Sequence, residues 1–176
     1  MRSSRTRTNL GAVTDLRVVF VCWGNICRSP MAERVAERMA EDRGLTGVEF
    51  TSAATSSEEL GAPIDRRAET VLREHGYRVD GHKAHRITRD EIENADMVIA
   101  MEDIHVTRMM GLAPEARNVS LLTDYDPNAE PGSGVPDPWY GTADGFYDTL
   151  SAVEAALPGV LDRVRELQEG SETSSR

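Results

Sequence analysis

The 176-residue sequence predicts one α/β domain, a doubly wound, three-layer arrangement in which a parallel sheet carries helices on both faces. Two observations predict this class. Four short apolar segments rich in β-branched residues have the composition of buried parallel strands, and segments with helical periodicity lie between them. Strands that alternate with helices are joined by crossover connections, which make neighbouring strands parallel.

The first strand is expected at 16–22, LRVVFVC, and Gly24 and Asn25 then break the apolar run. A helix should begin around Pro30, because the fixed φ and missing N–H of proline suit a first helical position. Apolar side chains spaced four residues apart follow and give the helix one buried face. Gly44 should end this helix in a left-handed turn.

The second strand is expected at 48–52, and a helix with an apolar stripe follows at about 65–75, before Gly76. Further along the chain, Glu91 lies three positions after Thr88. This is the spacing of a capping box, so a short helix should follow Thr88.

The third strand is expected at 97–101, MVIAM, followed by a helix at about 104–110 and a fourth strand at 119–122. Helical periodicity resumes over 143–167. Pro158 should kink or break this last helix, because proline lacks the backbone N–H that a helix interior requires.

The connection at 124–145 contains four prolines and four glycines. Connections of that length in compact domains are commonly functional. The two ends of the chain are polar and lack periodicity, so we expect a disordered extension at 1–14 and a disordered tail at 169–176 around a domain at 15–168.

The composition limits the class of protein. No run of 18 apolar residues occurs, and the N-terminal sequence lacks the apolar core of a secretory signal, so we expect a cytoplasmic location, with secretion by a signal-independent route left open. A net charge of −10 argues against nucleic acid and anionic membranes as partners. We expect the chain to act as a monomer.

The chain has only two cysteines, Cys22 and Cys27. They are too few and too close together for a disulfide scaffold, and they cannot supply a structural zinc site, so neither a metal nor a cofactor is expected. In a reducing compartment, such cysteines are more often catalytic or redox-active than structural.

The segment from Cys22 to Ser29, Cys-Trp-Gly-Asn-Ile-Cys-Arg-Ser, lies between a strand end and a helix start. A loop in this position points backbone N–H groups inward and adds the positive end of the helix dipole, which makes an oxyanion site. Gly24 allows the sharp turn, and Arg28 can bind two phosphate oxygens with its planar guanidinium. The same positive field would stabilise a nucleophilic Cys22 thiolate.

The full segment VCWGNICRSPMAE resembles the phosphate-binding loop of the bacterial low-molecular-weight protein tyrosine phosphatases, whose pattern is C-x-G-N-x-C-R-S-P. The segments TSAATSS, EHGYRVDGHKAHRIT and DPWY also resemble segments of this family, so the similarity covers about 17–167. It implies a four-stranded parallel sheet. It also implies hydrolysis of protein phosphotyrosine through a cysteinyl-phosphate on Cys22, without a metal.

The resemblance also implies roles for individual residues. Arg28 and backbone N–H groups would bind phosphate, and Asp137 would act as general acid and then as general base, although Asp124 and Asp126 lie in the same loop. The remaining residues of the phosphate-binding loop are Trp23, Gly24, Asn25, Ile26, Cys27 and Ser29. Ser29 could donate a hydrogen bond to the sulfur, and Asn25 could hold the loop from behind.

The substrate cleft would be lined by Trp23, Trp139 and Tyr140, although the last two could instead belong to the core. Ser52 and His82 match positions that brace Asn25 and Ser29. Two departures from the family are visible. Glu58 replaces an aromatic residue on the cleft wall, and Trp23 replaces a smaller residue, so peptide preference cannot be transferred.

Three other functions are possible for such a loop. An arsenate reductase would need further cysteines, and none follows Cys27. An arginine phosphatase would have Thr in place of Ile26 and would lack Tyr140. A non-catalytic phosphate-binding module would not need an intact nucleophile and acid. The expected substrate is a phosphotyrosine protein, such as a bacterial tyrosine kinase, an exopolysaccharide-export protein or a host protein.

Overall fold

The computed structural model describes residues 15–174, so the expected extension at 1–14 lies outside the described residues. Its elements are β1 (Leu16–Cys22), α2 (Arg28–Asp42), β2 (Val48–Ala54), α3 (Arg66–Glu74), α4 (Arg89–Asn94), β3 (Met97–Ala100), α5 (Asp103–Leu112), β4 (Val119–Leu121), the 3₁₀ turns η1 (Leu122–Tyr125) and η2 (Pro138–Tyr140), and α6 (Gly145–Ser174). The four expected strands are all present.

The four strands form one parallel sheet in the order β2-β1-β3-β4. β1 lies inside the sheet, where Cys22 is in register with Ala54 of β2. Because every strand runs in the same direction, the carboxyl ends of all four lie at one edge. The loops that follow β1, β2, β3 and β4 therefore start at that edge, which is where ligands bind in open parallel sheets.

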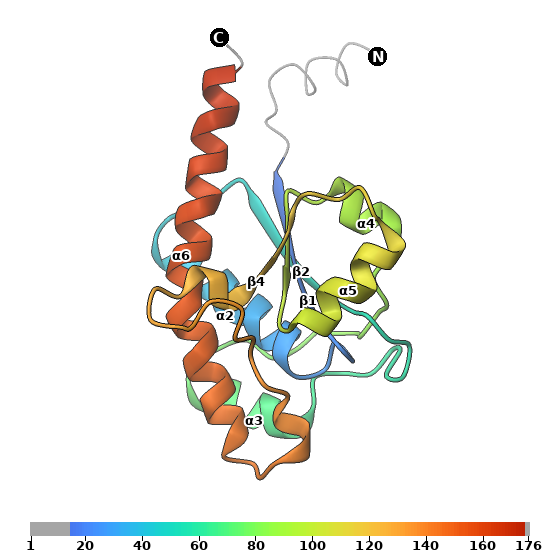
Figure 1. Ribbon diagram of the computed structural model, residues 1–176. Helices are drawn as coiled ribbons and strands as arrows, with labels where there is room; N and C mark the ends of the chain where they lie inside the picture. Colours follow the sequence, from blue (N-terminus) through green and yellow to red (C-terminus); the bar gives the residue numbers. More distant parts are fainter. Residues whose placement is uncertain (1–14, 175–176) are drawn as a thin grey trace, which may run out of the picture.

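Side chains alternate between two cores along β1. Val18 and Phe20 face α2, α3 and α6, whereas Val19 and Val21 face α4 and α5. Figure 1 shows these two groups of helices on opposite sides of the sheet. The predicted three-layer, doubly wound α/β fold with a four-stranded parallel sheet is thus confirmed.

The helix boundaries follow the local signals closely. α2 begins at Arg28, two residues earlier than predicted, so Pro30 is its third residue, where the missing N–H is still not needed inside the helix. Gly44 has a φ of 68° and follows the end of α2 in the left-handed conformation that glycine allows. The capping box of Thr88 and Glu91 is formed at the start of α4.

The predicted break at Pro158 is wrong, because α6 continues through this residue. An internal proline costs about 3 kcal/mol, but Leu157 and Leu161 on either side are fully buried, and each buried leucine contributes about 1.5–3 kcal/mol. At Gly159 a Cβ atom would lie 2.4 Å from the carbonyl oxygen of Tyr125, so α6 and η1 pack directly against each other.

The predicted disordered tail is also wrong over 169–174, which form the last turns of α6. Once a helix exists, each added residue gains a hydrogen bond at little further cost. Gln168 additionally donates from Nε2 to the carbonyl oxygen of Thr46 at 2.7 Å, which ties this end of α6 to the loop before β2.

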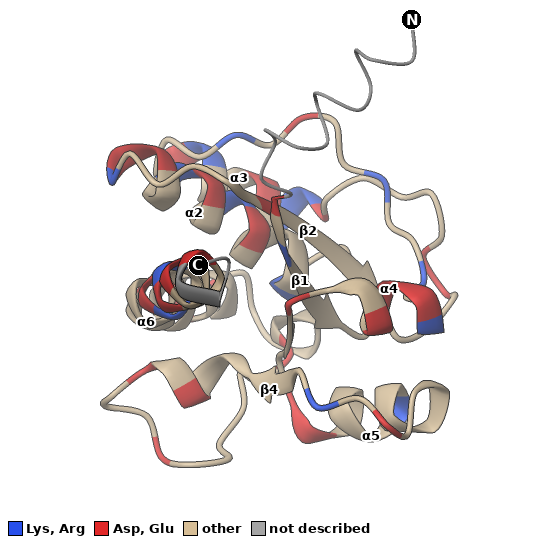
Figure 2. Ribbon diagram, turned by 90° about the horizontal axis from the view of Figure 1, so that it is seen from above, with Lys and Arg blue, Asp and Glu red and all other residues tan. Residues whose placement is uncertain are grey.

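Acidic segments occur on α2, α4 and α6 in Figure 2, so no single element carries the net charge of −10. Within the described residues, no helix is both long and apolar enough to span a bilayer.

Candidate active site

The loop between β1 and α2 is held in a curled shape by Asn25. This residue has a φ of 61°, a left-handed conformation that asparagine tolerates better than most residues, and it is fully buried. Its Nδ2 donates to the hydroxyl of Ser29 at 2.8 Å and to that of Ser52 at 3.0 Å. Its Oδ1 accepts from the backbone N–H of His85 at 3.1 Å.

The backbone of Asn25 is also held, because its carbonyl oxygen lies 2.6 Å from Nε2 of His82. Burial lowers the pKa of His82, so the ring stays neutral and donates from this nitrogen at neutral pH. The structure therefore places Ser52 and His82 against Asn25, which in turn contacts Ser29. The sequence-based expectation of a brace behind the loop matches this geometry.

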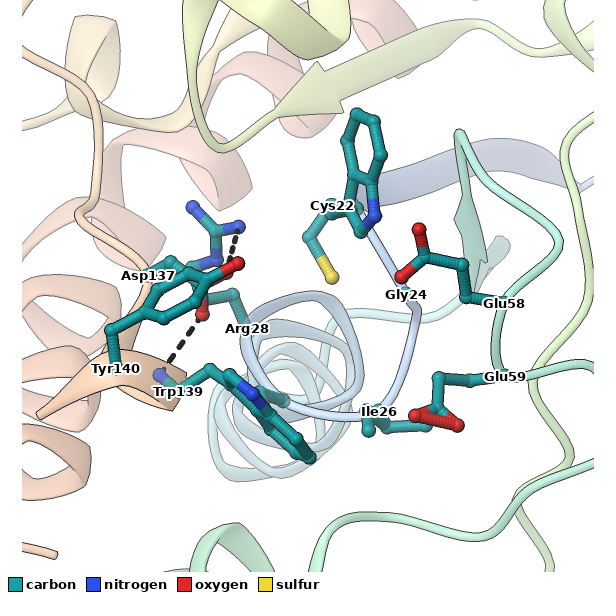
Figure 3. A pocket seen from close by; sticks show the side chains of 11 residues that line it. Cys22, Gly24, Ile26, Arg28, Glu58, Glu59, Asp137, Trp139 and Tyr140 are labelled. Atoms are coloured by element: carbon teal, nitrogen blue, oxygen red, sulfur yellow. Dashed lines mark hydrogen bonds and ion pairs between the residues drawn. The ribbon is translucent and has the colours of Figure 1, made fainter.

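Cys22 ends β1 with its sulfur at the centre of the curled loop (Figure 3), and only 2% of the residue is exposed. Its Sγ lies 3.1 Å from the Ser29 hydroxyl and 3.4 Å from the Ser29 backbone N–H. The Ser29 oxygen accepts from Asn25 Nδ2, and the Ser29 hydroxyl also lies 3.4 Å from the carbonyl oxygen of Ala53, to which it can donate. Two polar groups of Ser29 therefore lie next to the sulfur.

Glu33 closes this chain of hydrogen bonds and was not recognised in the sequence. The hydroxyl of Ser52 donates to Oε1 of Glu33 at 2.5 Å. Burial raises the pKa of Glu33, and the hydrogen bond from Ser52 partly opposes that rise. No local signal marks this residue, because its position on α2 becomes meaningful only when β2 packs beside it.

Arg28, the first residue of α2, is 2% exposed and connects three segments of the chain. Its Nη1 donates to Oε1 of Glu102 at 2.5 Å and to the carbonyl oxygen of Val135 at 2.8 Å, and its Nη2 lies 3.4 Å from Oδ2 of Asp137. Its Nε is buried and has no acceptor among the described residues. A buried donor without a partner at an anion site indicates a place for a ligand oxygen.

Glu102 was also not recognised in the sequence. It is the N-cap of α5, and its backbone N–H donates to Nδ1 of His105 at 3.1 Å. Burial, together with the nearby charges of Arg28 and Arg108, lowers the pKa of His105 to about 3, so the ring is neutral at physiological pH. His105 thus positions the carboxylate that orients Arg28.

Asp137 lies in the long loop before α6, as the N-cap of η2. Its Oδ1 accepts from the backbone N–H of Trp139 at 3.0 Å, and its other oxygen faces Arg28 (Figure 3). The two other candidates for the general acid make hydrogen bonds elsewhere in the loop. Asp124 accepts from the backbone N–H of Leu121, and Asp126 accepts from that of Asn128. Asp137 is the acid of this loop that lines the cleft, which favours it as the proton donor.

A cleft of about 120 Å³ opens over the sulfur of Cys22. Its floor is formed by 22–24 and 26–28. Glu58 and Glu59 form one wall, and Trp139 and Tyr140 lie on the opposite side (Figure 3). Residues from three separate parts of the sequence therefore meet around the nucleophile.

The three aromatic residues expected at a substrate cleft all line this one, and none belongs to the buried core. Trp139 is 43% exposed and is held by the guanidinium of Arg67, 4.8 Å from its ring, whereas Tyr140 is 87% exposed and lies on the rim. Trp23 also lines the cleft, with the guanidinium of Arg108 4.6 Å from its ring.

Cys27, the second cysteine, is a free and buried thiol beneath the cleft, like Cys22. Burial raises its pKa well above the usual value, and the charge of Asp65 adds to this rise. Cys27 is therefore a neutral thiol in the resting protein. Across 15–174, no group of three or more potential ligands is placed to hold a metal ion.

The fold and site together define a class of protein, in which a cysteine nucleophile lies in an oxyanion-binding loop between a parallel strand and a helix. Comparison with known proteins narrows this class. The model of the family "Low molecular weight phosphotyrosine protein phosphatase" matches residues 17–170. The chain belongs to this family.

Named relatives cover nearly the whole chain. It is 46% identical over 159 residues to a low molecular weight protein-tyrosine-phosphatase of Streptomyces coelicolor, covering 88% of this chain and 96% of that protein. It is 40% identical over 153 residues to the low molecular weight protein-tyrosine phosphatase A of Mycobacterium tuberculosis, covering 86% and 93%. The crystal structure of a protein tyrosine phosphatase from Entamoeba histolytica superimposes with a TM-score of 0.82 at 29% identity, covering 88% of this chain and 99% of that one.

Proposed function

We propose that this protein hydrolyses protein phosphotyrosine through a cysteinyl-phosphate intermediate on Cys22. The observation that carries the proposal is the floor of the cleft, where the Cys22 sulfur lies beside the buried Arg28, whose Nε has no partner within the described part of the chain. The family relationship supports the same reaction.

In the first step, the phosphate dianion binds to the backbone N–H groups of the loop and to Arg28. The Cys22 thiolate attacks phosphorus in line, and an S–P bond forms as the bond from phosphorus to the tyrosine oxygen breaks. Asp137 donates its proton to the leaving oxygen, so tyrosine departs as a neutral phenol. The hydrogen bond from Ser29 stabilises the thiolate before attack.

In the second step, water attacks the phosphorus of the cysteinyl-phosphate and gives one proton to the Asp137 carboxylate. The S–P bond breaks, inorganic phosphate leaves, and the Cys22 thiolate and the protonated Asp137 are restored. Charge stabilisation by the loop and Arg28 supplies most of the rate acceleration, because phosphate monoesters react very slowly in water.

The lining of the cleft supports an aromatic substrate. A phenyl ring between Trp139 and the opposite wall would place its phosphate on the floor, and we expect the shorter phosphoserine side chain, which has no ring to pack there, to bind less well. Ile26 lines the cleft as an apolar residue, which fits a phenyl ring better than the polar group of phosphoarginine.

The test compares one peptide sequence carrying phosphotyrosine, phosphoserine or phosphoarginine, with kcat/KM measured on purified protein. We expect turnover of the phosphotyrosine peptide alone, and Ile26→Thr should raise phosphoarginine turnover relative to it. Faster hydrolysis of phosphoarginine by the wild type would refute the proposal. An arsenate reductase or a non-catalytic phosphate-binding module would turn over none of the three.

This proposal includes a cytoplasmic location, supported by two free thiols in the described chain, and a monomer as the working unit, which size-exclusion chromatography with light scattering would test. The substrates are phosphoproteins. A tyrosine kinase, an export protein or a host protein remain the candidate sources, and trapping with Cys22→Ser in a lysate of phosphorylated proteins would identify them.

A further inference from the structure

One wall of the cleft carries two carboxylates that have no partner. Glu58 and Glu59 follow β2 and line the cleft opposite Trp139 (Figure 3). Neither side chain makes an ion pair or a hydrogen bond with another described residue. The stem of Glu59 packs over the loop, with its Cγ 3.4 Å from the position a Cβ would take at Gly24. Both carboxylates therefore lie unpaired, within the described residues, at the cleft.

The other charged groups around the nucleophile are already paired. Glu33 accepts from Ser52, whereas Glu102 and Asp137 both face Arg28. Arg28 is the basic residue of the cleft lining, which otherwise contains three carboxylates. The floor thus attracts an anion, through the loop N–H groups, the start of α2 and Arg28, while the mouth carries the two unpaired carboxylates. Two arginines lie behind the aromatic residues of the lining, where Arg67 is paired with Asp65 and Arg108 donates to the carbonyl oxygen of Thr55.

A substrate must match both charges. Its phosphate dianion binds to the floor, as the unpartnered Nε of Arg28 indicates. The peptide on either side of the phosphotyrosine stays at the mouth, next to Glu58 and Glu59. A flanking acidic side chain would be repelled there, whereas a flanking lysine or arginine would supply the missing cation.

We propose that Glu58 and Glu59 select phosphotyrosine flanked by basic residues, which rests on the proposed function and specifies its substrate class. Glu58 is exposed and Glu59 half-buried, so each ion pair gains only a small factor. A flanking lysine gains weak, exposed ion pairs, and a flanking glutamate meets repulsion by the like charges of the two carboxylates. We therefore expect about a tenfold preference for a lysine-flanked over a glutamate-flanked peptide.

The test uses three short peptides of one sequence, with lysine, alanine or glutamate on both sides of the phosphotyrosine. kcat/KM should fall in that order for the wild type at low ionic strength. Raising the ionic strength from about 0.01 M to about 1 M shortens the screening length from about 30 Å to about 3 Å, so the preference should shrink to about twofold or less. This part needs only the wild type.

The double variant Glu58→Gln, Glu59→Gln should lose the preference. Glu115→Gln is the matched control, because Glu115 is exposed, unpaired within the described residues, and lies before the amino end of β4, at the opposite edge of the sheet. It should retain the preference. Thermal unfolding of the variants checks that they fold.

Each outcome decides the question. Equal kcat/KM for the three peptides, or a preference for glutamate, overturns the inference while leaving the proposed function intact. A lysine preference that survives in the double variant also overturns it, because another surface must then be responsible. Failure to hydrolyse any phosphotyrosine peptide would instead refute the proposed function.

Discussion

Substitution of Asn25 by alanine tests the central idea that one buried amide shapes the phosphate-binding loop. The change removes three side-chain hydrogen bonds, to Ser29, to Ser52 and from the backbone of His85. At about 1 kcal/mol each, they account for about 3 kcal/mol. Alanine at a φ of 61° costs about 1–2 kcal/mol more. We expect the free energy of unfolding to fall by about 4–5 kcal/mol.

The same variant should lose activity, because the Ser29 hydroxyl then loses its shortest contact, the one from Asn25 that holds it beside the Cys22 sulfur. A hydrogen bond to a charged group contributes about 1.5–3 kcal/mol, so kcat/KM should fall by about 10- to 100-fold. Urea denaturation gives the stability, and hydrolysis of p-nitrophenyl phosphate gives the activity of the folded fraction.

Asn25→Gly is the matched control, because it loses the same hydrogen bonds but adopts the left-handed conformation without strain. The greater freedom of unfolded glycine costs about 0.5–1 kcal/mol, so this variant should be slightly more stable than Asn25→Ala. A loss of less than about 1 kcal/mol in both variants would show that the hydrogen-bond chain does not hold the loop.

Three further predictions concern the chemistry. Cys22→Ser should abolish turnover and retain phosphate binding, and residual turnover above about a thousandth of wild type would exclude the covalent mechanism. Arg28→Lys should be severely impaired, because a point charge cannot replace the planar guanidinium. Phosphate titration measures the binding of both variants, and kinetics measure their turnover. Asp137→Asn should lower kcat by about 10²–10⁴-fold on phenyl phosphates with poor leaving groups and by less on activated ones. If the loss of kcat depends on the leaving group in this way in Asp124→Asn instead, then Asp124 is the general acid. Peroxide should inactivate the protein by oxidising Cys22, and Cys27 should then trap the oxidised sulfur as a Cys22–Cys27 disulfide, which dithiothreitol reduces again. The trapping is favoured because oxidation of Cys22 removes a negative charge that raises the pKa of Cys27. Mass spectrometry should detect the linkage, and full recovery of activity in Cys27→Ser would contradict the idea that Cys27 protects Cys22.

The sequence by itself determined the elements and the anion-binding loop. The strand 16–22, the loop and the start of α2 lie within about 15 consecutive residues, so alternation, turn chemistry and helix signals are all readable there. The capping box of Thr88 and Glu91 is local in the same way. The two wrong expectations, at Pro158 and at 169–174, arose because burial beside the proline and continuation of α6 outweighed local preferences.

Only the tertiary structure decided how the loop is supported and what stands at the mouth of the cleft. Arg28 bonds to Glu102 and Val135, which are 74 and 107 positions away, and His82 reaches Asn25 across 57 positions. No local pattern encodes such contacts, because they form when parallel strands bring their carboxyl ends to one edge of the sheet. The same edge leaves Glu58 and Glu59 facing an empty space rather than a partner, so the charge that this cleft presents to a substrate is a property of the packing.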